Sequence, residues 1–134
     1  MTTTPKQARQ EEPISFEQKL AVLTAHLEGH MKRCEEVRDR FDKDRQPKRW
    51  MFNHGLRDGY FHTVNEINSG DEEQKAGRKA TNCAWTKKIF ENCIVQNTAA
   101  RDRRESDSVE WNYYEGIRQA YVESLRLLEV TMSD

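Results

Sequence analysis

The chain has 134 residues, enough for one domain that buries a core without the help of a metal ion or disulfide bonds. Its 22 basic and 23 acidic residues leave a net charge of −1, so it has neither the positive field that holds nucleic acids and anionic membranes nor the acidic excess of a DNA mimic. The three cysteines form no CxxC pair, which argues against a zinc site and a secreted disulfide framework. We therefore expect one cytoplasmic domain with no cofactor and with neither nucleic acid nor membrane as a partner.

The first helix is predicted from a cap and a repeating apolar pattern. Residues 1–13 are polar throughout, so we expect a disordered tail there and neither a signal peptide nor a membrane anchor. Ser15 and Gln18 then form a capping-box pattern that predicts a helix start. Apolar or small residues follow at the alternating spacing of a helix packed along a neighbour: Phe16, Leu20, Leu23, Leu27, His30, Cys34, Val37 and Phe41. The pattern predicts a helix over residues 15–43.

The second helix and a hinge come next. Pro47 suits the first turn of a helix, and the predicted helix covers residues 47–68. The polar residues 69–78 follow, with Gly70 as a helix stop. We expect this segment to connect two halves of the molecule.

The second half repeats the helical pattern. A third helix is predicted over residues 79–103, with few large apolar residues, so we expect it to be the least buried element. A cap pattern at residues 107–110 predicts a fourth helix that continues to about Val130. No alternating apolar pattern typical of strands occurs, and the predicted fold class is all-α.

The most informative pattern occurs twice. The motif W-x4-G-[LI]-R-x-[GA]-Y spans Trp50 to Tyr60 and again Trp111 to Tyr121, and an Arg-Asp-Arg segment precedes each copy. We therefore expect residues 14–134 to form a single four-helix bundle. Its two tandem αα-hairpins, residues 15–68 and 79–131, would be related by a pseudo-twofold axis.

One face of the repeated helix is predicted to lie in the core. Its members in the two copies are Phe52, Leu56, Tyr60, Thr63, Ile67, Tyr113, Ile117, Tyr121, Ser124 and Leu128. Small residues lie along one edge of this face, and small residues let two helix backbones approach closely. They are Gly55, Gly59, Gly116 and Ala120.

The opposite face carries a stripe of aromatic, charged and apolar residues, which we call the repeated stripe. Its members are Trp50, His54, Arg57, Phe61, Trp111, Glu115, Arg118 and Val122. Because aromatic residues and arginine are the usual anchors of protein interfaces, we predict that the repeated stripe binds another protein or a second copy of the chain. In a second interpretation the tryptophans only cover the loops, and the arginines bridge to Asp58 or to the Arg-Asp-Arg segments. In a third, arginines and tyrosines grip a small anionic nucleotide between subunits.

The histidines suggest a metal site. His26 and His30 are four residues apart, a spacing that can place two imidazoles on one ion. His54, Asp58 and His62 form a second ladder, but the repeat replaces it with other residues away from the predicted core. We interpret His30 as a hydrogen-bonded core histidine and predict no bound metal.

Acidic residues suggest an enzyme. Glu35, Glu36 and Asp39 resemble the ExxD half of the all-α nucleoside triphosphate pyrophosphatases, and the resemblance implies magnesium held between paired carboxylates. That family also has an ExxE motif, whereas here neither Glu17 nor Glu66 has an acidic residue three positions later. We therefore interpret the three carboxylates as partners of neighbouring basic residues on a solvated helix face.

The expected function is binding rather than catalysis. The sequence has no GxSxG motif, phosphate-binding loop or dinucleotide fingerprint. The segment from Gly55 to Ile67, GxRDGYxxxxxEI, resembles small accessory proteins of bacteriophages, which implies a protein that binds and blocks a host factor in the host cytoplasm. We predict a cytoplasmic interaction or inhibitory protein that forms a homo-oligomer or binds another protein. The alternative is a nucleotide-binding or metal-dependent nucleotide-hydrolysing bundle that uses the acidic residues and histidines named above.

Overall fold

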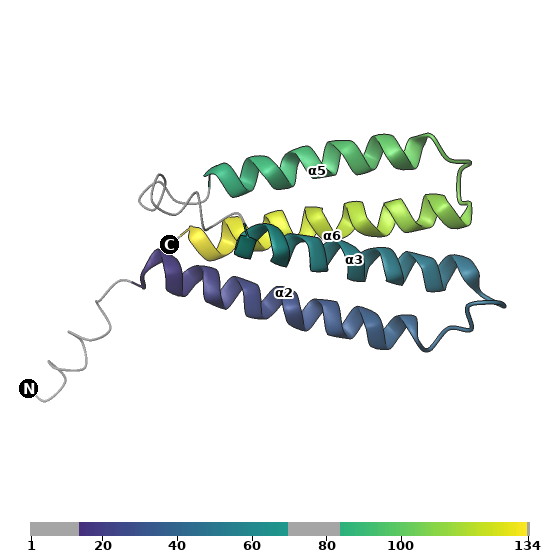
Figure 1. Ribbon diagram of the computed structural model, residues 1–134, viewed down its shortest axis with the longest axis horizontal. Coiled ribbons are helices and arrows are strands. Elements are labelled where there is room, and N and C mark those ends of the chain that lie inside the picture. The colour runs from purple at the N-terminus through teal and green to yellow at the C-terminus, as the bar shows by residue number, and fades with distance from the viewer. Residues whose placement is uncertain (1–13, 70–83, 134) are drawn as a thin grey trace, which may run out of the picture.

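The computed structural model describes residues 14–69 and 84–133. They form four helices, which are α2 (Phe16–Arg38), α3 (Pro47–Ser69), α5 (Ala84–Asp102) and α6 (Val109–Met132). No strand occurs in these two ranges, and the helices lie side by side as a bundle (Figure 1). The all-α prediction is therefore confirmed. The predicted tail, all but the first residue of the predicted hinge, and the first residues of the predicted third helix lie outside the described residues.

The two helices that carry the sequence repeat lie at the centre of the bundle. The most extensive packing is between α3 and α6, with α2 packed on α3 and α5 packed on α6 (Figure 1). The loops that follow α2 and α5 lie at the same end of the molecule, where Lys48 Nζ lies 3.2 Å from Asp107 Oδ2. Within the described residues, no helix combines the length and apolarity needed to cross a membrane.

Side-chain caps begin α2 and α6. The predicted capping box is confirmed, because Ser15 Oγ accepts from the Gln18 N–H at 3.1 Å and Gln18 Oε1 accepts from the Ser15 N–H at 2.9 Å. At α6 the N-cap is Ser108, whose Oγ accepts from the Trp111 N–H at 3.1 Å. The preceding Asp107 has a φ of 61°, a conformation that aspartate tolerates better than most residues. This conformation turns the chain just before the N-cap residue Ser108.

The predicted length of the first helix is wrong. The helix ends at Arg38, five residues before the predicted end at residue 43. The carboxylate of Asp42 accepts hydrogen bonds from the backbone N–H groups of Asp44 and Arg45, at 2.8 and 3.2 Å. Such a local turn offers the backbone an alternative to helical hydrogen bonds. The apolar spacing continues as far as Phe41, but the chain forms the Asp42 turn after Arg38 instead of a further helical turn.

The core lies between the central pair and the outer helices. Its buried apolar residues are Leu23, Leu27, Tyr60, Val64, Ile67, Phe90, Ile117, Ala120, Tyr121 and Leu128. Thr63 and Ser124 are fully buried between α3 and α6, where the Ser124 hydroxyl donates to Thr63 Oγ1 at 3.3 Å. The predicted core face is confirmed except at Phe52, Leu56 and Tyr113, which are only partly buried.

Glycines allow the close approach of α3 and α6. A Cβ atom added to Gly55 would lie 2.1 Å from the carbonyl oxygen of Tyr113, and one added to Gly116 would lie 2.3 Å from the carbonyl oxygen of Phe52. Neither distance is sterically allowed, so only glycine permits this packing. The close approach predicted from the small residues is confirmed.

Candidate functional site

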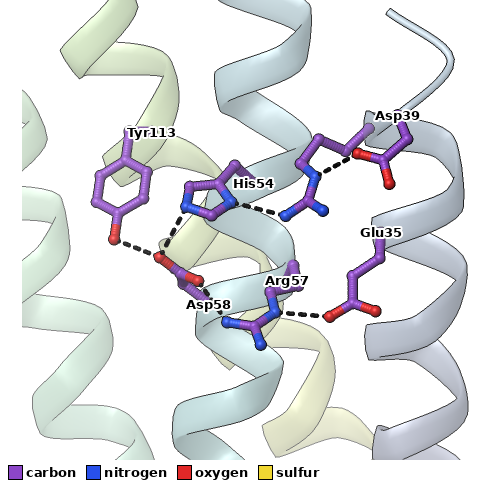
Figure 2. A network of polar contacts seen from close by, with 7 residues as sticks. Glu35, Asp39, His54, Arg57, Asp58 and Tyr113 are labelled. Atoms are coloured by element: carbon purple, nitrogen blue, oxygen red, sulfur yellow. Dashed lines mark hydrogen bonds and ion pairs between the residues drawn. The ribbon is translucent and has the colours of Figure 1, made fainter.

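A polar network joins α2, α3 and α6 (Figure 2). The Tyr113 hydroxyl donates to Asp58 Oδ2 at 2.6 Å, and His54 Nε2 lies 3.5 Å from the same oxygen. On its other side, His54 Nδ1 lies 3.0 Å from Arg38 Nη1. Because a guanidinium can only donate, Nδ1 is the acceptor and a neutral His54 carries its proton on Nε2.

Arg57 extends this network to a second carboxylate. Its Nε donates to Glu35 Oε2 at 2.9 Å, and its Nη1 donates to Asp58 Oδ1 at 3.0 Å (Figure 2).

Burial lowers the pKa of His54 from its ordinary value, although the nearby Asp58 acts in the opposite direction. Burial and the positive charge of Arg38 therefore favour the neutral form of His54.

Trp50 lies beside this network and contacts cations of its own chain. The Arg38 guanidinium carbon lies 5.3 Å from the centre of the indole ring, and Lys43 Nζ lies 4.6 Å from it. The imidazole of His54 stacks on the indole at 4.9 Å between ring centres. These distances are typical of cation–π and stacking contacts, so the Trp50 side chain packs within the α2–α3 hairpin and stabilises it.

The second copy of the repeat has Glu115 where the first has His54. Glu115 is buried and accepts four hydrogen bonds. Arg101 Nη1 donates at 2.7 Å, Arg118 Nε and Nη2 donate at 3.0 and 2.8 Å, and Gln119 Nε2 donates at 2.7 Å. These bonds, that of Arg118 foremost, lower the pKa of Glu115 to about 2.

The repeated stripe is therefore not one continuous exposed surface. Only Phe61 and Val122 are exposed, at 38% and 43%, and the other six members are partly or fully buried. The Arg101 guanidinium lies 5.4 Å from the centre of the Trp111 ring. This contact matches the one between Arg38 and Trp50 in the first copy of the repeat. Arg57 bridges to Asp58 as in our second interpretation, whereas Arg118 donates to Glu115 and not to an Arg-Asp-Arg segment. Whether the repeated stripe binds a partner stays a prediction.

A groove of about 470 Å³ lies between α2, α3 and α6. It is lined by His30, Leu56, Tyr60, Arg118, Gln119, Val122 and Glu123. The His30 ring stacks on Tyr60 at 5.2 Å, and Arg33 Nη2 lies 2.7 Å from His30 Nδ1. His30 is therefore hydrogen-bonded as predicted, but it is only partly buried and lies at the groove instead of in the core. Sequence patterns assigned Leu56 and Tyr60 to the core, and the groove above them follows only from the placement of three helices.

The acidic candidates are mostly engaged by arginines. Asp39 Oδ1 accepts from Arg38 Nε at 2.9 Å and Glu35 accepts from Arg57, while Glu36 is exposed. His26 is exposed too. In the part of the chain that the structure describes, no group of three or more His, Cys, Asp or Glu side chains could hold a metal ion.

Known proteins offer no parallel. No family model matches the chain, and no curated protein or solved structure is significantly similar to it. Its function must therefore be argued from its own side chains. Two features of the described residues are candidates for binding, namely the exposed apolar residues Phe61 and Val122 and the groove beside α6, which Val122 also lines.

Proposed function

We propose that the chain is a cytoplasmic interaction protein that binds another protein, or a second copy of itself, through Phe61 and Val122. The supporting observation is their exposure at matching positions of the repeated helix, 38% for Phe61 and 43% for Val122. Each lies one helical turn after an arginine, and the Arg57 guanidinium lies 5.0 Å from the Phe61 ring centre. Phenylalanine and arginine are both enriched in protein interfaces, so the Phe61–Arg57 pair has the composition of an interface anchor. An accessory protein that blocks a host factor would bind in this way.

We also infer that the two hairpins are related by a pseudo-twofold axis between α3 and α6. The reciprocal glycine contacts support this relation, because Gly55 meets the carbonyl of Tyr113 as Gly116 meets that of Phe52. Phe52 and Tyr113 are themselves matching positions of the repeat. Such an axis would present the binding surface twice and make the protein bivalent.

The proposal is tested with the double variant Phe61→Ser/Val122→Ser. The matched control is Val95→Ser on α5, because Val95 is also an exposed apolar residue, at 68%. Substitutions at exposed positions usually change stability by less than about 0.5 kcal/mol, so all three proteins should fold. We expect the double variant to lose self-association in light scattering, or partner capture in an affinity pull-down, and the control to keep it.

A double variant that still associated or captured as well as the control, with unchanged helix content by circular dichroism, would contradict the proposal.

The alternative of metal-dependent nucleotide hydrolysis has weaker support. The carboxylates of Glu35 and Asp39 already bind Arg57 and Arg38. Their charges are thus already compensated by arginines, whereas a magnesium site needs carboxylate oxygens that bind the ion.

A further inference from the structure

The groove between α2, α3 and α6 contains a buried hydroxyl group that is available to a ligand. Tyr60 lines the groove and is only 6% exposed. Its hydroxyl makes no hydrogen bond within residues 14–69 and 84–133. Buried polar groups in proteins nearly always have a partner, so an unpaired one suggests an acceptor from outside the chain. Burial raises the pKa of Tyr60 to about 12, and the hydroxyl therefore remains a donor at neutral pH.

Two further donors line the same groove. Arg118 binds Glu115 through Nε and Nη2, and its Nη1 has no hydrogen-bond partner among the described residues. His30 accepts from Arg33 on Nδ1, which leaves the proton on Nε2. The groove thus gathers a hydroxyl, a guanidinium and an imidazole N–H.

Apart from Gln119, whose amide donates to Glu115, the rest of the groove is apolar or carries a paired charge. Leu56 and Val122 contribute apolar surface, and Tyr60 adds the aromatic ring that stacks on His30. The carboxylate of Glu123 is paired with Arg126. The volume of about 470 Å³ lies within the range of roughly 300–1,000 Å³ found for small-molecule sites.

We propose that this groove binds a small molecule that joins an aromatic ring to one oxyanion, either a carboxylate or a phosphate. The oxyanion accepts hydrogen bonds from Tyr60, Arg118 and His30, because donors that line one groove favour a ligand with acceptor oxygens. The ring lies against Leu56 and Val122. The ligand is not a protein, but Val122 belongs both to this groove and to the proposed protein-binding surface, so Phe61 is the residue that distinguishes the two proposals.

The test uses two pairs of probes in NMR titrations of the full chain. Indole-3-acetate and phenyl phosphate carry both a ring and an oxyanion, whereas indole lacks the oxyanion and inorganic phosphate lacks the ring. We expect the first two to shift the backbone amide signals of groove residues, with a Kd of about 1 mM or tighter. Phenylacetate carries the phenyl ring of phenyl phosphate with a carboxylate instead, and the stronger binder of these two identifies the preferred oxyanion. Indole and inorganic phosphate should bind at least tenfold more weakly.

Two matched variants test the role of the hydroxyl. Tyr60→Phe keeps the ring and its stacking on His30, and should weaken probe binding about tenfold without loss of stability, because the hydroxyl has no partner to lose. Tyr113→Phe removes a hydroxyl that is bonded to Asp58, so it should lower stability and leave probe binding unchanged. Val122→Trp should fill the mouth of the groove and abolish binding.

Three results would overturn the proposal. They are the absence of amide shifts in the groove with both ring-bearing oxyanions, equal binding to the parent and to Tyr60→Phe, and equal binding of indole and indole-3-acetate. None of these results involves Phe61, which does not line the groove, so the single variant Phe61→Ser tests the protein-binding proposal separately.

Discussion

Arg38 donates to His54 Nδ1, and a second proton on the imidazole would remove that acceptor. At the matching position of the repeat, Glu115 accepts from Arg101, and its pKa is held at about 2. A drop from neutral to mildly acidic pH therefore changes the first contact and leaves the second as it is. The α2–α3 hairpin responds to pH at a position where the α5–α6 hairpin does not.

We predict that the free energy of unfolding of the full chain rises with pH between about 5 and 7. The pKa of His54 lies below its ordinary value of 6.5 in the folded protein, so the unfolded chain takes up its proton first. The contribution of His54 is complete above pH 6.5 and is lost as the pH falls through its folded pKa. One such group adds at most about 1.4 kcal/mol per pH unit. Urea unfolding at a series of pH values measures the slope.

His54→Gln should reduce this slope but not abolish it, because the pKa of His30 is also lowered by burial and acts with the same sign. Glu115→Gln is the matched control. It should reduce stability by a similar amount at every pH from 5 to 8, since Glu115 stays ionised throughout. If His54→Gln kept the full slope of the parent, the pH response would have to come from other groups.

At the level of the elements, the packing of α3 on α6 depends on backbone contact more than on side-chain size. Gly55 and Gly116 place each helix against a carbonyl oxygen of the other. Gly29 on α2 lies in a different environment, where an added Cβ would meet only the end of the Arg33 side chain, at 3.7 Å. Replacing glycine by alanine should therefore lower the free energy of unfolding at Gly55 and Gly116 but raise it at Gly29.

We predict that Gly55→Ala and Gly116→Ala each lower the free energy of unfolding by about 3 kcal/mol, because the two helices must move apart. Gly29→Ala should raise it by roughly 0.5–1 kcal/mol through higher helix propensity. Midpoints of urea unfolding, read by circular dichroism, compare the three variants. Equal effects at Gly29 and Gly55 would show that the α3–α6 approach is looser than described here.

At the scale of the whole molecule, we predict self-association through Phe61 and Val122. Light scattering over a concentration series should give a mass that is a multiple of the 15.8 kDa chain and that decreases on dilution. The Phe61→Ser/Val122→Ser variant should have the monomer mass at every concentration. A constant monomer mass for the parent would contradict self-association and leave a foreign protein as the proposed partner.

The sequence by itself determined the features that depend on short-range interactions. Ser15 and Gln18 identified the start of α2, because a capping box involves only four neighbouring residues. Helical spacing identified the buried face of the repeated helix, and Gly55 identified the close approach. The first helix was predicted too long because apolar spacing continued past Arg38, although Asp42 already carried the contrary turn pattern.

Tertiary structure decided which side chains of the repeated stripe remain exposed. Periodicity shows which residues share a face of a helix, but not which neighbouring helix covers that face. Trp50 and Glu115 are covered because arginines of α2 and α5 reach them, whereas Phe61 and Val122 are not covered to the same extent. The groove at Tyr60 likewise exists only where α2, α3 and α6 meet. Contacts between residues far apart in the chain depend on how whole helices pack, and no local pattern encodes that packing.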